Sequence, residues 1–124
     1  YRCGTYLEFM IAVFVYQIFV VWLAYDNAER IAQGKRIYHG LNGLLHLLAA
    51  AIVLVHGWQY SVALLFLTRI VFDSSLNLFR NLSLGYVTPK PKSIVDKIEQ
   101  AIFGRNGYTP KIIYAIIVCL ALVL

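Results

Sequence analysis

The chain has 124 residues, of which 60% are hydrophobic and only 14% are charged, and its formal net charge is +5. Soluble domains average about 45–50% apolar and about 25% charged residues, so this composition excludes an ordinary soluble domain. The positive charge lies mostly in loops between long apolar blocks, as is typical of proteins that cross a membrane. We therefore predict an all-α, polytopic transmembrane helical bundle in a lipid bilayer.

The first apolar block, residues 5–25, is long enough at 1.5 Å per residue to cross a hydrocarbon core of about 30 Å. The helix is predicted to continue beyond the membrane and to end at Gly34, because glycine is favoured at the C′ position. The loop 26–36 that follows this span is basic.

The second predicted span, residues 37–57, has a regular face. Its members recur at alternating spacings of four and three: His39, Gly43, His46, Ala50, Val53 and Gly57. Gly43, Ala50 and Gly57 are small, so we expect another helix to pack closely there. The turn 56–59 is too short to reach any helix except the next one, which predicts an antiparallel hairpin with the third span.

The third span, residues 60–84, is predicted to end at Gly85 and carries four polar residues on one helical stripe, Arg69, Asp73, Asn77 and Arg80. A charge at the bilayer centre costs at least about 2.5–3.5 kcal/mol, so these side chains must face protein, water or one another. Counting outward from the turn places His46 level with Arg69, and Asn42 level with Asp73. We therefore predict a buried polar cluster made of His39, Asn42, His46, Arg69, Asp73, Asn77 and Arg80.

Two shorter elements follow the third span. In residues 93–103, Ser93 and Asp96 form a helix-start pattern and Gly104 a stop, and the apolar residues share one face. This pattern predicts an amphipathic interfacial helix, lying on the membrane or docked on the loop side of the bundle. Residues 110–124, with Thr109 as N-cap, reach only about 22 Å, so we expect a fourth span that is truncated.

The distribution of Lys and Arg predicts sidedness. The turn 56–59 has neither residue, whereas the loops 26–36 and 85–109 are rich in both. The positive-inside rule then places those loops on the cytoplasmic side, and the N-terminus and the turn on the opposite side. The same loops are expected to attract anionic lipid headgroups.

The sequence contains no catalytic or cofactor motif. GxSxG, GxxxxGK[ST], GxGxxG and HExxH are all absent, so we predict no catalytic residue and no cofactor. A metal site would need His46 and Asp73 together, and with one well-placed carboxylate we predict none. Basic and aromatic residues do not interleave in a patch, so no nucleic-acid partner is expected.

These observations favour a non-enzymatic accessory or structural subunit of a larger membrane assembly. It would associate with a protein partner, or with itself, through its membrane helices. Two alternatives stay open. One is a proton- or ion-conducting or holin-like protein with His46 as the titrating group. The other is a membrane-embedded, metal-assisted enzyme that acts on a lipid.

Overall fold

The computed structural model of the chain describes residues 3–37, 39–89, 91 and 93–124, and only the backbone of residues 3–6. Within these ranges the secondary structure is entirely helical. The elements are α1 (Cys3–Ala32), α2 (His39–Val53), the 3-10 turn η1 (Leu54–His56), α3 (Trp58–Phe79), α4 (Ile94–Phe103) and α5 (Tyr108–Val123). Among the described residues, three helical stretches are long and apolar enough to cross a membrane, or up to four if α4 and α5 together form one bent span.

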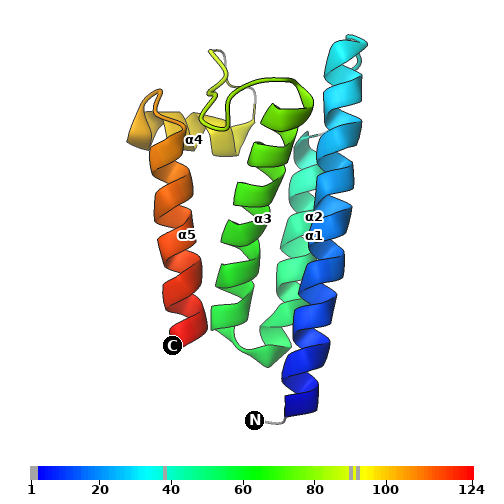
Figure 1. The fold of residues 1–124 in the computed structure, drawn as a ribbon, viewed down its shortest axis with the longest axis vertical. Coiled ribbons are helices and arrows are strands. Elements are labelled where there is room, and N and C mark those ends of the chain that lie inside the picture. The colour runs from blue at the N-terminus through cyan, green and yellow to red at the C-terminus, as the bar shows by residue number, and fades with distance from the viewer. Residues whose placement is uncertain (1–2, 38, 90, 92) are drawn as a thin grey trace.

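Helix α3 is the centre of the bundle. It packs against α1, α2 and α5, and Figure 1 shows α1 and α5 on its two sides. Helices α1 and α3 run in the same direction, while α2 and α5 run the opposite way. We call the end with residues 33–37, residues 80–89 and α4 the loop end. The end with η1 and Leu124 is the hairpin end (Figure 1).

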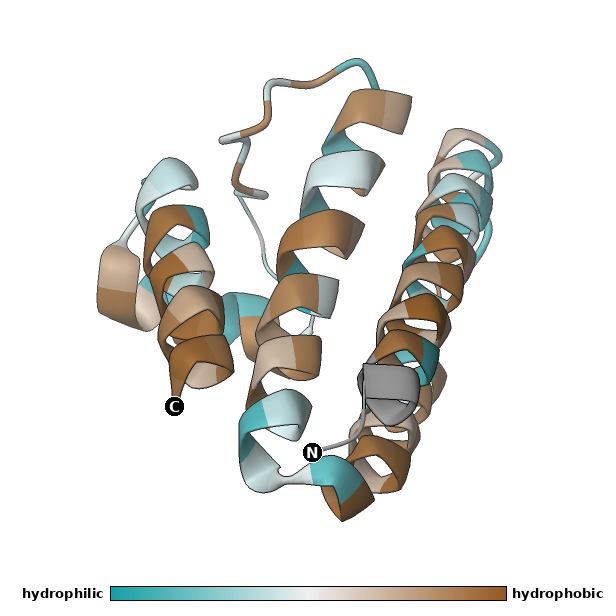
Figure 2. Ribbon diagram, turned by 60° about the horizontal axis from the view of Figure 1, so that its bottom comes forward, coloured by the Kyte–Doolittle hydropathy of each residue, from teal (hydrophilic) through white to brown (hydrophobic). Residues whose placement is uncertain are grey.

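Helices α1 and α3, which pack against each other, carry most of the buried apolar residues. Val20, Leu23 and Ala24 are at most 7% exposed on α1, and Ala63 and Leu64 are buried on α3. Small residues on both helices let the backbones approach closely. Outside this interface the helices expose large apolar side chains, and Figure 2 shows apolar colouring along their middle turns. Such surfaces are compatible with a location in a membrane.

The ends of α1 and of the α2–α3 hairpin follow the sequence patterns. Gly34 has φ +70°, and the amide of Lys35 donates to the carbonyl of Arg30, which confirms the predicted glycine stop. The turn between α2 and α3 is tight, and Ser61 Oγ donates to the carbonyl of Ala50 at 2.7 Å. The predicted antiparallel hairpin is therefore present.

Helix α3 ends at Phe79, earlier than the predicted bound of 84. Asn81 takes the C′ position with φ +58°, and the amides of Asn81 and Leu82 donate to Leu78 and Asn77. This is the Schellman arrangement, which asparagine adopts because it tolerates the left-handed conformation. Gly85 is thus not the helix stop. It lies where an added Cβ would overlap the ring of Tyr108.

Helix α4 has the predicted ends, whereas α5 begins earlier than predicted. The Ser93 side chain accepts from the amide of Asp96 at 3.1 Å, and Gly104 caps the other end with φ +67°. Gly107 is the N-cap residue of α5, and Asn106 Oδ1 accepts from the amides of Tyr108 and Thr109, so Thr109 lies within the first turn and is not the N-cap. The axes of α4 and α5 differ by 101°. Helix α4 therefore lies across the bundle at the loop end (Figure 1).

Candidate functional site: an ionic network between three helices

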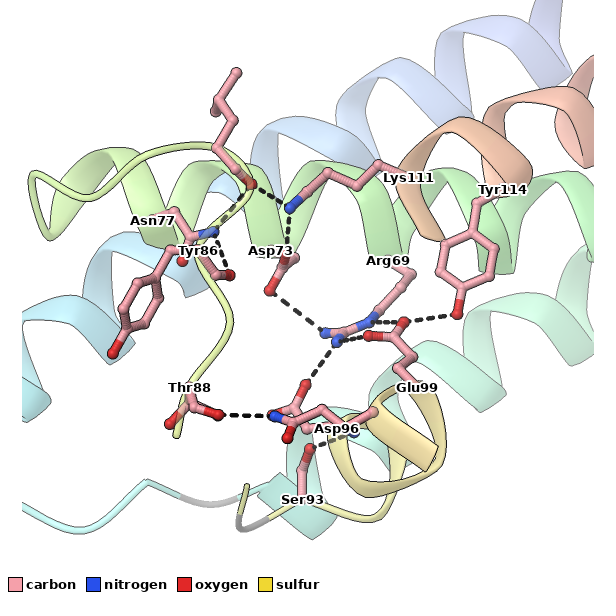
Figure 3. A network of polar contacts seen from close by, with 12 residues as sticks. Arg69, Asp73, Asn77, Tyr86, Thr88, Ser93, Asp96, Glu99, Lys111 and Tyr114 are labelled. Atoms are coloured by element: carbon pink, nitrogen blue, oxygen red, sulfur yellow. Dashed lines mark hydrogen bonds and ion pairs between the residues drawn. The ribbon is translucent and has the colours of Figure 1, made fainter. Parts of the chain in front are cut away.

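Arg69 is the twelfth of the 22 residues of α3, so its backbone lies near the middle of an apolar helix. Its guanidinium turns toward α4. Glu99 accepts from Nε at 3.0 Å and from Nη2 at 2.6 Å, and Asp96 accepts from Nη2 at 2.6 Å (Figure 3). On α3 itself, Asp73 Oδ1 lies 4.0 Å from Nη1. One arginine thus joins the centre of the bundle to the helix that crosses its end.

Helix α5 completes the arrangement. Lys111 Nζ lies 2.6 Å from Asp73 Oδ2 and also donates to the carbonyl of Leu84. The Tyr114 hydroxyl donates to Glu99 Oε2 at 2.7 Å (Figure 3). We call the six residues the ionic network: Arg69, Asp73, Asp96, Glu99, Lys111 and Tyr114. Its charged side chains are 14–27% exposed.

The composition of the ionic network explains how charged side chains can lie against the middle of an apolar helix. Removing an ion from water costs several kcal/mol, and the cost is offset only where partners and further hydrogen bonds have good geometry. Both carboxylate oxygens of Glu99 accept hydrogen bonds from Arg69, which is the strong bidentate arrangement of a carboxylate and a guanidinium. Three carboxylates face two cations, so the network carries one formal negative charge in excess.

Neutral hydrogen bonds hold the loop after α3 against this network. Asn77 is 3% exposed, and its Nδ2 donates to the carbonyls of Leu84 and Tyr86 at 3.2 and 3.4 Å. Gln100 on α4 donates to the carbonyl of Thr88 at 2.7 Å. Residues 84–88 are therefore tied to α3 on one side and to α4 on the other.

A cavity of about 260 Å³ lies beside the network at the loop end. Arg69, Asp73, Asp96, Glu99, Lys111 and Arg80 contribute charged groups to its lining. Ile31, Ile37 and Ile70 contribute apolar groups. The cavity is thus bordered by α1, the start of α2, α3, α4 and α5, and most of its charged lining belongs to the ionic network.

A second and separate polar contact lies between α1 and the α2–α3 hairpin. The Tyr16 hydroxyl and His46 Nδ1 share a hydrogen bond of 2.7 Å, and the His46 ring lies 6.1 Å from that of Phe72. Gln17 Nε2 donates to Thr68 Oγ1 at 3.1 Å, while Gln17 Oε1 is buried without a hydrogen-bond partner among the described residues. These bonds link α1, α2 and α3 through neutral groups.

The structure divides the residues of the predicted cluster between these places. Arg69, Asp73, Asn77 and Arg80 border the cavity, and His39 borders it from the start of α2. His46 instead bonds to Tyr16, and Asn42 is a half-buried residue of α2. The difference arises because the Arg69–Asp73 side of α3 is covered by α4 and α5, whereas α2 packs along another side.

The small residues of α2 also differ among themselves. Ala50 is buried beside Ser61, as close helix packing requires. Gly43 is exposed, and an added Cβ there would meet nothing within 4 Å among the described residues. Gly57 lies in the turn with φ +132°, which favours glycine for conformational reasons rather than for helix packing.

Sequence reasoning missed four members of the network: Asp96, Glu99, Lys111 and Tyr114. The signal that could have found them is charge complementarity. Asp96 and Glu99 are three residues apart, so they share a face of α4, and Lys111 and Tyr114 share a face of α5 in the same way. Asp96 and Glu99 are opposite in charge to Arg69, and Lys111 is opposite in charge to Asp73, but only the bend between α4 and α5 brings them together.

Neither a metal-binding arrangement nor a similar known protein indicates a function for this site. Within the described ranges, no group of three His, Cys, Asp or Glu residues is arranged to hold a metal ion. No protein-family model, curated protein or solved structure matches the chain.

Proposed function

We propose that this chain is a non-enzymatic structural or accessory component of a larger membrane assembly, and that the ionic network is its internal brace. The observation that carries the proposal is that Arg69, at the middle of an apolar helix, is paired with carboxylates of its own chain. Its charge is thereby used to hold α4 and α5 against α3. A brace of this kind gives a small bundle a defined shape with which partners can pack.

The outer face of α2 is the surface that we propose for a partner. Leu44 and Leu47 are more than half exposed there, and an added Cβ at Gly40 or Gly43 would meet no atom of the described residues within 4 Å. Glycines on an exposed face of a membrane helix permit close approach of another helix backbone. The occupant is a transmembrane helix of a partner protein or of a second copy.

We also propose an orientation for the bundle. Residues 26–36 and 85–109 supply the basic groups of the loop end, and the positive-inside rule puts that end in the cytoplasm. On α4, Ile94, Val95 and Ile102 are exposed while Asp96 and Glu99 bind Arg69. This distribution supports an amphipathic helix whose apolar side contacts lipid.

Disulfide cross-linking in native membranes tests the partner surface. Cys3 and Cys119 are first replaced by serine, and single cysteines are then placed at position 43 or, as a matched control on an exposed α1 face, at position 15. We expect Gly43→Cys to give a cross-linked product and Val15→Cys to give none. The mass of the product distinguishes a second copy from another protein. Absence of any product with Gly43→Cys contradicts the proposal.

A second function, conduction of protons or ions, is favoured by one specific observation. The lining of the cavity includes Arg69, near the middle of α3, and the Tyr16–His46 bond lies at a similar level of the bundle, because His46 contacts Phe72. Conduction predicts that purified protein makes liposomes permeable, and that Asp73→Asn or His46→Ala abolishes the flux. Unchanged flux in both variants, or none in the wild type, rejects conduction and favours the brace.

A further inference from the structure

The charges around the cavity at the loop end are unevenly placed. On one side the ionic network has three carboxylates and two cations, which leaves one negative charge in excess. About two helical turns beyond Asp73, at the end of α3, Arg80 has no carboxylate within 4.0 Å in the described ranges, and its guanidinium lies 5.8 Å from the centre of the Tyr86 ring. The cavity therefore has an anionic side and a cationic side.

We propose that this cavity binds a phosphoethanolamine group, as found in the headgroup of phosphatidylethanolamine. Its primary ammonium would supply the cation that the network lacks. Its phosphate would bind to Arg80, since guanidinium and phosphate form strong charge-assisted hydrogen bonds. The ligand as a whole is a zwitterion, so it balances both sides of the cavity without adding net charge.

The hydrogen-bonding capacity of the network fits an ammonium. A carboxylate offers about four acceptor positions, and an ammonium has three N–H donors. Asp96 uses only Oδ1 for Arg69 among the hydrogen bonds of the described residues, so Oδ2 can accept from a ligand. Asp73 is 27% exposed and also borders the cavity.

The size and the remaining lining of the cavity fit a headgroup. A volume of about 260 Å³ is far more than the ~30 Å³ that one water occupies in the liquid, and slightly less than the ~300 Å³ of small drug-binding pockets. Ile31, Ile37 and Ile70 add apolar groups to the lining. A phospholipid likewise combines a polar headgroup with apolar acyl chains, so both kinds of lining can contact it.

This inference takes from the proposed function only the placement of the bundle in a bilayer. Its test is native mass spectrometry of the whole chain in detergent after incubation with equal amounts of phosphatidylethanolamine, phosphatidylcholine and phosphatidylglycerol with matched acyl chains. We expect phosphatidylethanolamine to be retained preferentially, because phosphatidylcholine has no ammonium N–H and phosphatidylglycerol has no ammonium. Retained lipid and cross-linked partner are separate readouts, so one proposal can fail while the other stands.

Variants of Arg80 give the decisive comparison. Arg80→Gln is expected to reduce retention of phosphatidylethanolamine about tenfold, as for the loss of one charge-assisted hydrogen bond. Arg80→Lys keeps the charge and should keep most of the lipid. Arg105→Gln is the matched control, because Arg105 is exposed at the same end and does not line the cavity. Unfolding of each variant is monitored by circular dichroism.

Two results would overturn the inference. One is equal retention of phosphatidylethanolamine by the wild type and by Arg80→Gln. The other is retention of phosphatidylglycerol as strong as that of phosphatidylethanolamine, which would indicate a purely anionic ligand. Soluble glycerophosphoethanolamine, which keeps the phosphodiester and its single negative charge, separates the two sources of the group. Its displacement of the lipid assigns recognition to the headgroup alone, and failure to displace assigns it to the intact lipid; both support the zwitterion.

Discussion

On the side of α3 that meets α1 and α2, the contacts are small apolar residues and neutral hydrogen bonds, such as Gln17–Thr68 and the contact of Ser61 with Ala50. On the side that meets α4 and α5, the contacts centre on Arg69 and Asp73 and on the charges that surround them. The first side resembles ordinary packing between membrane helices, where small residues allow close approach. The second side depends on the pairing of charges, so a single unpaired group there is costly. This difference predicts that equivalent substitutions on the two sides have very different effects.

The largest expected effect comes from Arg69→Gln. This change removes the cation shared by three carboxylates and leaves them close together with only Lys111 as a cationic partner among the described residues. Loss of one partner of a buried ion pair costs about 3–5 kcal/mol, and we expect about 3 because the side chains keep partial contact with water. The free energy of unfolding is measured by SDS titration in mixed micelles. Arg105→Gln is the control, and equal stability of the two variants would refute the brace.

A smaller loss is expected for Glu99→Gln, and it should exceed that of Asp96→Asn. Glu99 accepts two hydrogen bonds from Arg69 and one from Tyr114, whereas Asp96 accepts one from Arg69. Hydrogen bonds to charged groups contribute about 1.5–3 kcal/mol, so we expect about 2 kcal/mol for Glu99→Gln and about half of that for Asp96→Asn. The same SDS titration measures both. The reverse order would contradict the central place given to Glu99.

Two glycine-to-alanine changes compare a packed turn beside the ionic network with an exposed face of α2. At Gly107 an added Cβ would overlap the carbonyl of Gly85 at the turn between α4 and α5, so Gly107→Ala should cost about 1–2 kcal/mol through overpacking. At Gly43 the added Cβ has open space, so Gly43→Ala should stabilise the isolated chain by about 0.5–1 kcal/mol through helix propensity. Melting curves of the purified variants measure both effects. If both variants were less stable than the wild type, or both more stable, the predicted contrast between the two positions would be wrong.

The smallest expected effect is that of Tyr16→Phe. It removes the hydrogen bond to His46 and leaves the apolar ring in place. Hydrogen bonds between membrane helices contribute about 0.6 kcal/mol on average. A loss above about 2 kcal/mol in the SDS titration would show that the α1–α2 side also depends on a polar brace.

The spans and the hairpin on one side of α3 could be predicted from regular sequence patterns. The ionic network on the other side could be predicted only in part. Length and hydropathy predict the spans, glycine at position 34 predicts the end of α1, and the short turn after His56 predicts the hairpin. The stripe of Arg69 and Asp73 predicts that a polar face exists, because charges in hydrocarbon are costly. Which helix covers that face depends on the bend between α4 and α5 and on the path of residues 84–88, and neither has a periodic signal.

Helix α3 shows the same limit at its end. Gly85 has the residue type that usually stops a helix, yet Asn81 takes the left-handed position four residues earlier. Asparagine adopts this conformation less commonly than glycine, so sequence reasoning prefers the glycine. Gly85 is needed for another reason, because Tyr108 packs directly against its Cα. That contact joins residues far apart in the sequence and has no local pattern.

The proposed brace depends on the energetic coupling between Arg69 and Glu99, and a double-mutant cycle measures that coupling most directly. Arg69→Gln, Glu99→Gln and the double variant are compared with the wild type by SDS titration. We predict that the double variant is more stable than the sum of the single losses implies, with a coupling energy of about 2 kcal/mol, within the usual range for residues in one network. A coupling energy below about 0.5 kcal/mol would show that the two residues act independently and would contradict the brace.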